Sequence, residues 1–306
     1  MINIAIAGLG KIARDEHVPT IRHSREFKLV AVASPHNSLD AVSNYPDIQS
    51  LLEHRQDVSA VAVCTTPHAR YQVARYALER GLHVLLEKPP GMTVSEVIAL
   101  ADLAVRQGVT LFASWHSRYA AGVEPARTWL AERRILGVRV SWKEDVRVWH
   151  PGQKWIWEAG GLGVFDPGIN ALSILTRIMP GTLILRQAHL SYPNNCETPV
   201  AGRLVLAGPD GAPVDMELDF LQTGPQTWDI VAETEDGQLR LSLGGRKLTI
   251  DDRPVELAAI PEYTALYSRF AALIREGRSD VDLAPLQLVA DALLCGQRTT
   301  VEAFIE

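Results

Sequence analysis

The sequence has little that would direct the chain to a membrane, to nucleic acid or out of the cell. No run approaches the ~20 apolar residues of a membrane span. The N-terminus lacks a secretory signal pattern and opens directly on the strand-like stretch 2–7. The formal net charge of −6 argues against binding to polyanions such as nucleic acid or an anionic membrane surface. We therefore expect a cytoplasmic protein with no nucleic-acid or membrane partner.

Cysteine is also scarce. The three cysteines are far apart and form no CxxC pair, so no disulfide framework is expected. Cys64 and Cys295 lie in apolar runs and are predicted to be small buried hydrophobic residues. The nine histidines include no HExxH motif, and the sequence predicts no metal site.

The first motif of the sequence is a glycine-rich turn close to the N-terminus. The apolar stretch 2–7 has strand length and is followed by GxGxxA at Gly8–Ala13, at the start of a predicted helix. Gly8 permits a tight turn, Gly10 lets the backbone approach a pyrophosphate, and Ala13 lets the helix pack closely on the sheet. The N–H groups at the helix N-terminus favour phosphate. This context predicts a dinucleotide site, the alternative being a simple tight turn.

Strand and helix then alternate as far as residue 113. Strands are predicted at 27–33, 59–64, 83–86 and 109–113, and helices at 47–52, 69–80 and 94–107. Asp47 is a predicted N-cap, Thr93 and Glu96 form a predicted capping box, and Gly81 is expected to end a helix. The alternation predicts a doubly wound parallel sheet, a Rossmann domain over residues 1–118.

The loops after these strands are expected to meet the cofactor, because ligands bind at the carboxyl ends of parallel strands. The second strand ends in 34–37, Ser-Pro-His-Asn, with neither the acid typical of NAD sites nor the Arg typical of NADP sites. We expect NAD, with NADP tolerated. His68 is either a cofactor contact or a polar helix cap. The predicted cofactor contacts are Gly8, Gly10, Lys11, Ile12, Ser34, His36, Thr65, Pro67, His68, Glu87 and Lys88.

The character of the chain changes after Ala113, and residues 119–306 are predicted to form a second, α+β domain. The segment 137–148 alternates as one long strand that places the carboxylate of Glu144 on an otherwise apolar face, where it must pair with a cation or bind a ligand. Strand-like runs follow at 183–192, 200–206, 214–220, 228–233, 238–242 and 248–250. Helices are predicted at 125–130, 171–178, 263–275 and 286–304. This order predicts a large, mostly antiparallel open sheet with helices on one face and a homodimer through the other.

The glycine-rich segment 160–170 runs into the apolar helix predicted at 171–178. Asp166 and Asn170 are four residues apart at its start, so they share one helical face, roughly 5–6 Å apart between Cβ atoms. A carboxylate can accept a proton, and an amide can orient the group that loses it. The pair is therefore a candidate catalytic site.

Taken together, Gly8–Ala13, Glu87-Lys88-Pro89 and the GG…DxGxN segment 160–170 resemble the glucose–fructose oxidoreductase / inositol dehydrogenase (Gfo/Idh/MocA) family. Similarity extends across nearly the whole chain. The family usually has His where this chain has Asn170. The blocks 142–147, 149–153 and 163–173 are most similar to the L-arabinose / D-galactose 1-dehydrogenase branch.

This resemblance implies oxidation of L-arabinose or D-galactose at C1 to the aldonolactone, with hydride transfer to NAD(P). Asp166 is the first choice for the base, Lys88 polarises the C1 oxygen and Asn170 orients the sugar; Lys88 as base with Asp166 as its partner is the alternative. A nucleotide-binding redox sensor, or an oxidoreductase for another sugar or polyol with tightly bound NADP, are other possible functions. The implied sugar contacts are Lys88, His116, Glu144, Trp149, His150, Asp166, Asn170 and Trp228.

Overall fold

The chain folds into two compact units. The computed structural model describes residues 1–258 and 260–306. Residues 1–116 and 263–283 form the first unit, and residues 117–262 and 284–306 form the second. The predicted boundary after residue 118 lies close to the first crossing, but the segment 263–283, which the sequence assigned to the second domain, belongs to the first. Among the described residues, no helix has both the length and the apolar character to cross a membrane.

The first unit is built on a six-stranded sheet in the order β3-β2-β1-β4-β5-β6, with every neighbouring pair parallel. This is the predicted Rossmann arrangement, with β1 at its centre. The strands are β1 (Ile2–Ala7), β2 (Phe27–Ala33), β3 (Ser43–Tyr45), β4 (Ala60–Val63), β5 (His83–Leu86) and β6 (Leu111–Ala113).

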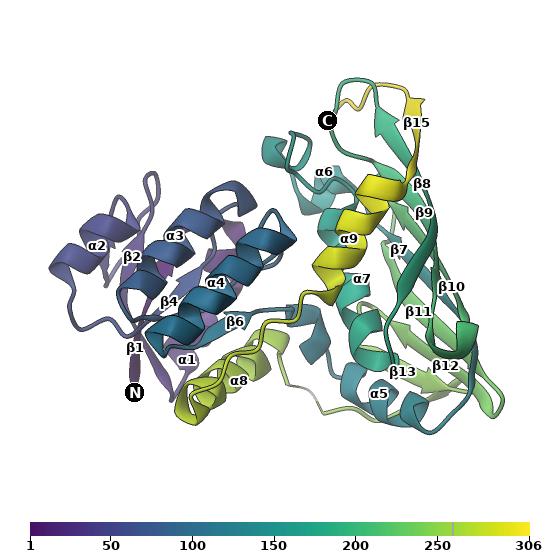
Figure 1. The fold of residues 1–306 in the computed structure, drawn as a ribbon, viewed down its shortest axis with the longest axis horizontal. Helices are drawn as coiled ribbons and strands as arrows, with labels where there is room; N and C mark the ends of the chain where they lie inside the picture. The colour runs from purple at the N-terminus through teal and green to yellow at the C-terminus, as the bar shows by residue number, and fades with distance from the viewer. Residues whose placement is uncertain (259) are drawn as a thin grey trace. The chain divides into compact units, whose positions relative to one another are not determined.

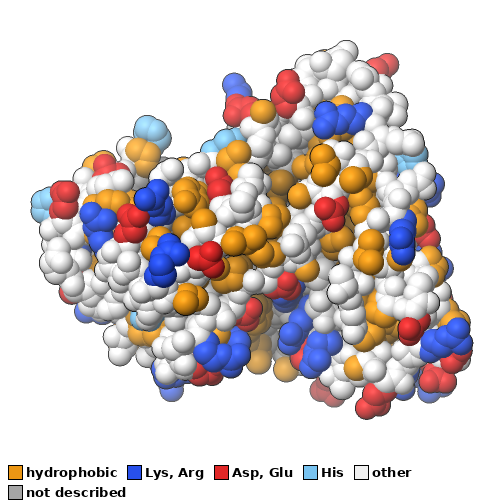
Figure 2. Space-filling model, viewed as in Figure 1, with side chains coloured by type: hydrophobic (Ala, Val, Ile, Leu, Met, Phe, Trp, Pro, Cys, Tyr) orange, Lys and Arg blue, Asp and Glu red, His pale blue; other side chains and the backbone are white. Residues whose placement is uncertain are grey.

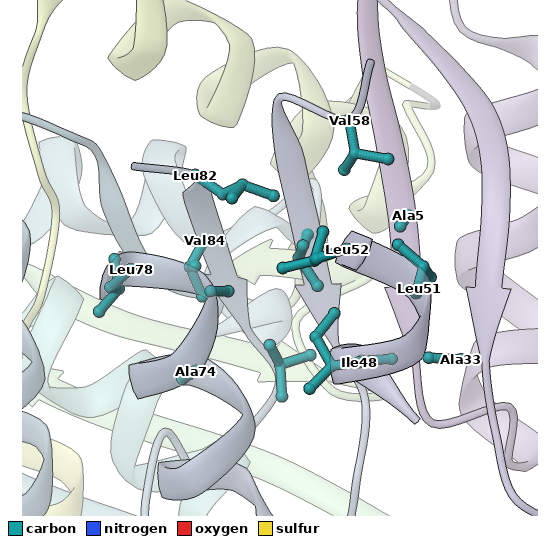
Figure 3. Packing of buried hydrophobic residues seen from close by; sticks show 14 of the residues in the cluster. Ala5, Ala33, Ile48, Leu51, Leu52, Val58, Ala74, Leu78, Leu82 and Val84 are labelled. Carbon is teal, nitrogen blue, oxygen red and sulfur yellow. The ribbon is translucent and has the colours of Figure 1, made fainter. Parts of the chain in front are cut away.

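Helices cover both faces of this sheet. On one face lie α2 (Ile48–His54), α3 (Pro67–Glu79) and α4 (Val94–Gln107) (Figure 1). Their apolar sides pack on the strands in a cluster that includes Ile48, Leu78 and Val84 (Figure 3). On the other face Phe27 of β2 stacks on Phe270 of α8 (Glu262–Glu276) at 5.6 Å between ring centroids. The helix after the glycine turn contains a π-helical turn (Ala13–His17) followed by α1 (Val18–His23).

The predicted helix caps of the first unit are present in the structure. The Asp47 carboxylate accepts the N–H of Ser50 at 2.7 Å, and Thr93 and Glu96 form both hydrogen bonds of the capping box. Gly81 follows α3 with φ of 75°, a conformation that glycine adopts without strain.

The second unit is built on a nine-stranded mixed sheet in the order β14-β13-β12-β11-β7-β10-β9-β8-β15. Neighbouring strands are antiparallel except in the pairs β10–β7 and β15–β8. Helices α5 (Val123–Ala131), α7 (Phe165–Ile178) and α9 (Ala284–Cys295) pack on one face (Figure 1). The strands are β7 (Ile135–Lys143), β8 (Ile184–Pro193), β9 (Ala201–Ala207), β10 (Pro213–Asp219), β11 (Thr227–Thr234), β12 (Gly237–Ser242), β13 (Lys247–Ile250), β14 (Arg253–Pro254) and β15 (Gln297–Val301). The remaining short helices are α6 (Val146–Trp149) and the 3-10 turns His116–Tyr119, Lys154–Ile156 and Pro209–Gly211.

Three predictions about this unit were wrong. The long strand 137–148 ends at Lys143, because Asp145 caps the short helix α6 by accepting the N–H of Arg147; Val148 is 69% exposed. The helix predicted over 286–304 ends at Cys295, and the β-branched residues beyond it pair with β8 as strand β15. Cys295 itself is exposed, whereas Cys64 is buried as predicted.

Acidic and basic side chains are interspersed over the face drawn in Figure 2, with no large patch of one sign. This distribution agrees with the modest net charge.

Candidate active site

The glycine turn after β1 has the geometry that the motif predicts. The Gly8 N–H donates to the Ala33 carbonyl at 2.8 Å, and Gly8 has φ of +92°. A Cβ at Gly8 would lie 2.6 Å from the backbone nitrogen of Thr65, so only glycine lets β1 and the loop after β4 approach this closely. A Cβ at Gly10 would meet nothing within 4 Å, which leaves open space at the start of the helix. A phosphate can approach the backbone there.

The other predicted cofactor contacts of the first unit lie in loops at the carboxyl ends of adjacent strands. Ser34 and His36 follow β2, Thr65 follows β4, and Pro67 and His68 form the first turn of α3. The Thr65 hydroxyl oxygen is buried and has no hydrogen-bond partner among the residues that the structure describes. Because a buried hydroxyl normally needs a partner, a ligand group beside Thr65 would satisfy it. These residues fit a dinucleotide.

Three side chains at the start of the first helix lie near the predicted dinucleotide site. Lys11 pairs with Asp15 one turn further along the helix, and Ile12 is 37% exposed. Arg14 donates to the carbonyl of Ser38 at 3.1 Å, which brings a cation to the segment after β2. The sequence did not predict this contact, because Arg14 lies on another element.

The carboxylate of Glu87 forms hydrogen bonds with other residues of the chain. It is buried and accepts hydrogen bonds from Tyr263 Oη at 2.7 Å and from the N–H of Lys88 at 2.8 Å, and its Oε1 lies 3.0 Å from Nε2 of His17. Burial alone would raise the pKa of Glu87, but the hydrogen bond and charge of His17 hold it well below its usual range. A Glu87 contact with the cofactor stays a prediction. Lys88 is half-buried.

His17 was not predicted. It is fully buried, and its Nδ1 lies 2.7 Å from Tyr267 Oη. Burial alone would lower the pKa of His17, but Cys64, Tyr267 and Glu87 together raise it well above its usual value. The signal for this residue is not in its local sequence, because its partners come from residues 87 and 267.

The predicted sugar contact His116 also lies in the first unit. Its ring stacks on that of Tyr263, with 5.5 Å between centroids and 17° between planes.

In the second unit, Asp166 and Asn170 lie on α7, which begins at Phe165 rather than at residue 171 as predicted. Asp166 is buried in the first turn, where the helix dipole favours a negative charge, and half-buried Asn170 lies one turn later. Gly163 makes this entry possible: its φ is +53°, and a Cβ there would lie 2.3 Å from the Pro199 carbonyl oxygen.

Two contacts hold α7 in place. A Cβ at Gly168 would lie 3.0 Å from the side chain of Leu218, so the helix packs closely on β10. Arg118 donates to the carbonyl of Ser173 at 2.9 Å and to the hydroxyl of Thr176 at 2.9 Å.

His150 lies between two buried carboxylates. Its Nε2 is 3.3 Å from Oε1 of Glu144 and its Nδ1 is 3.7 Å from Oδ2 of Asp166; the two carboxylate side chains are each 3% exposed. The other oxygen of Glu144 accepts the indole N–H of Trp228 at 2.8 Å. Glu144 therefore has the imidazole of His150 and the indole of Trp228 beside it, and its pairing with a cation or a ligand stays a prediction. The cluster brings together two carboxylates and an imidazole, the side-chain types that general acid–base catalysis uses.

Aromatic rings adjoin this cluster. Trp149, 39% exposed, packs on Trp228 at 4.9 Å between centroids, and Trp228 stacks on Trp142 at 6.0 Å. The structure thus brings together six predicted sugar contacts within the second unit: Glu144, Trp149, His150, Asp166, Asn170 and Trp228.

The loop that carries His150 is fastened by the last residues of the chain, which the sequence did not predict. Trp157 packs on Phe304 at 4.7 Å between centroids. The backbone of Phe304 forms two hydrogen bonds with the Asn195 side chain, at 2.8 and 2.9 Å.

Comparison with known proteins agrees with this architecture. Residues 2–114 match the model of the Gfo/Idh/MocA family, described as an oxidoreductase family with an NAD-binding Rossmann fold. Galactose 1-dehydrogenase from Pseudomonas fluorescens is 42% identical over 305 residues, which cover 100% of this chain and 99% of that protein. The chain belongs to this oxidoreductase family.

Solved structures agree with this assignment. The crystal structure of the D-galactose-1-dehydrogenase protein from Rhizobium etli is 53% identical with a TM-score of 0.95, covering 99% of this chain and 98% of that one. The WlbA dehydrogenase from Bordetella pertussis, in complex with NADH and UDP-GlcNAcA, is 19% identical with a TM-score of 0.81 over 96% of each chain. At that identity the second likeness shows the fold alone. The family and the fold class predicted from the sequence are therefore confirmed.

Proposed function

We propose that this enzyme oxidises an aldopyranose, D-galactose or L-arabinose, at C1 to the aldonolactone with transfer of hydride to NAD or NADP. The observation that carries the proposal is the cluster of Asp166, His150 and Glu144 beside exposed indole surface. Two relatives that match over nearly the full length are named as galactose 1-dehydrogenases, which supports the substrate class.

The reaction needs a group that takes the proton of the C1 hydroxyl. In our proposal Asp166 accepts it while the C1–H electron pair leaves as hydride and the C1–O double bond forms. When bound, the nicotinamide supplies the hydride acceptor. Lys88 polarises the C1 oxygen as charge develops, and Asn170 holds a ring hydroxyl. The alternative, Lys88 as base with Asp166 as partner, predicts the same products.

The aromatic surface and the polar cluster suit a sugar. In our proposal the rings of Trp149 and Trp228 face the apolar side of the pyranose, while Glu144, His150 and His116 bind hydroxyl groups. Galactose and arabinose differ at the C5 substituent, so discrimination depends on pocket volume there and is worth about 1–3 kcal/mol.

For the cofactor we propose NAD, with NADP accepted. Residues 34–38, directly after β2, include Ser34 and His36 but no carboxylate that would repel a 2′-phosphate. Arg14, which donates to Ser38 in the same segment, offers positive charge to such a phosphate.

The test is an initial-rate panel of aldoses, each with NAD and with NADP. We expect NADH formation with D-galactose and L-arabinose, and no rate across the panel with either cofactor would refute the proposed activity. Asp166→Asn should lower kcat by about 10²–10⁴-fold with the affinity for NAD nearly unchanged. Asp291→Asn, which changes an exposed carboxylate on α9, is the matched control and should leave kcat unchanged. A fully active Asp166→Asn variant would remove Asp166 from the role of base.

We also propose a homodimer through the sheet face opposite α5, α7 and α9. Charged side chains pair across the strands there: Arg139 lies 2.9 Å from Glu233, and Glu217 lies 2.8 Å from Lys143 and 2.6 Å from Arg203. Of these residues, Arg139, Arg203 and Glu217 line a hollow of about 780 Å³ that a second copy can fill. Light scattering on the purified protein tests this, and a monomer at micromolar concentration would refute it. The cytoplasmic location stays a prediction that cell fractionation checks.

A further inference from the structure

A buried polar cluster lies under the loop that carries Lys88. Glu87 is 2% exposed and His17 is 0% exposed, and both belong to the first unit. The carboxylate of Glu87 is contacted by His17, by the hydroxyl of Tyr263 and by the N–H of Lys88. Three separate parts of the chain thus converge on one carboxylate: the helix after the glycine turn, the loop after β5 and helix α8.

The backbone of the same loop is held from another side. The buried guanidinium of Arg70 donates to the carbonyl of Glu87 at 2.8 Å and also to the carbonyls of Pro89 and Thr65. The loop around Lys88 is therefore fixed both through the side chain of Glu87 and through its own peptide groups. Tyr263, which donates to Glu87, also stacks on His116.

Stability alone does not explain this cluster. Burying a charged pair removes both groups from water, and well-packed apolar residues of similar volume are often equally stable or more so. The pair instead fixes the position and orientation of the Glu87 carboxylate, because a carboxylate with three fixed donors can occupy only one position. The fixed carboxylate in turn fixes the backbone nitrogen of Lys88, which donates to it. The proposed function places the side chain of this residue at C1 of the sugar.

We propose that His17 is a positioning residue for Lys88, acting through the Glu87 carboxylate that accepts the Lys88 N–H. The inference rests on the proposed role of Lys88. His17 touches neither the sugar nor the cofactor in this scheme. It supplies the hydrogen bond from Nε2 that fixes Glu87, and Glu87 fixes the peptide from which the Lys88 side chain extends.

Two variants of His17 separate its two contacts. Gln places its amide nitrogen near the position of Nε2 and keeps a donor to Glu87, whereas Asn places it near Nδ1 and keeps the contact with Tyr267. Both remove the imidazole. We expect His17→Asn to lower kcat by about 10- to 100-fold, the loss typical of a misplaced reacting group. His17→Gln should restore most of that loss.

A second pair of variants avoids large changes in the core. Tyr263→Phe and Tyr267→Phe each remove one hydroxyl from α8, one turn apart, but only Tyr263 contacts Glu87. We expect Tyr263→Phe to lower kcat more than Tyr267→Phe. These substitutions decide the question if His17→Asn does not fold.

His83→Ala is the control for general damage to the first unit. His83 begins β5 and accepts the N–H of Thr110 at 3.0 Å, at the opposite end of the strand from Glu87. It should destabilise the unit with kcat unchanged.

Hydrogen exchange of the peptide that contains Lys88, measured by mass spectrometry, gives a readout that does not need turnover. Exchange there should rise in His17→Asn and Tyr263→Phe but not in His17→Gln or His83→Ala. Equal losses of kcat in His17→Asn and His17→Gln, or unchanged exchange at Lys88 in His17→Asn and Tyr263→Phe, would overturn the inference. If the wild type oxidises no aldose, the proposed function fails, and the exchange experiment alone then decides whether His17 holds this loop.

Discussion

His150 makes the most demanding prediction, because its ring lies between two buried carboxylates. Replacing it with Leu leaves Glu144 and Asp166, each 3% exposed in its side chain, without that partner. Removing the partner of a buried polar group costs about 1–3 kcal/mol, and more when that group is charged. Glu144 keeps the indole N–H of Trp228 at 2.8 Å, so we expect a loss of about 3 kcal/mol for the two carboxylates together. For a unit of this size that corresponds to a fall in melting temperature of about 6–12 °C.

Equilibrium unfolding followed by tryptophan fluorescence measures this loss, since six of the seven tryptophans lie in the second unit. Adding Glu144→Gln to the His150→Leu variant should recover at least about 1 kcal/mol, since one stranded charge is gone. A double variant no more stable than His150→Leu alone would show that the imidazole does not compensate these carboxylates.

Three further predictions concern other parts of the chain. Because the pKa of His17 is raised in the folded state, its contribution to the free energy of unfolding is complete below about pH 6.5 and is lost as pH rises through the folded-state pKa. Because the pKa of Glu87 is lowered, its contribution is complete above about pH 4.3 and is lost on acidification. Denaturation midpoints from pH 6.5 to 9 should therefore fall more steeply for the wild type than for His17→Gln, and parallel curves would contradict this. Arg14→Ala should lower kcat/KM with NADP by about 5- to 10-fold and with NAD by less, because only NADP carries the 2′-phosphate. Equal losses would rule out this contact. Phe304→Ala should raise the KM for the sugar and speed proteolysis near Trp157, with cofactor binding unchanged, and unaltered kinetics would show that this tail does not hold the loop.

Sequence patterns predicted elements whose causes are local. The strands 2–7, 27–33 and 83–86 and the helix 94–107 have the bounds that apolar runs and the capping box indicated. Strand β15 was missed because its pairing partner β8 lies about a hundred residues earlier in the chain and no local signal reports that pairing.

The residues of the candidate site also fall into two groups: those that local sequence patterns indicated and those that depend on distant parts of the chain. Asp166 and Asn170 were found because helical spacing places them on one face, and Glu144 because a carboxylate interrupts an apolar alternation. That His150 lies between two of these residues follows from the fold of the loop 150–163, which the sequence alone did not determine. His17 was missed for the same reason, since its partners come from two distant segments.

The return of α8 to the first unit affects how the protein is made. Phe27 and His17 find Phe270 and Tyr267 only after residues 117–262 have been synthesised. At about 5–20 residues per second, the part of the nascent Rossmann sheet that α8 covers stays uncovered for on the order of 10 s. During that interval the ribosome-bound chain presents an apolar surface to chaperones, and a fragment that stops at residue 118 would keep that surface permanently.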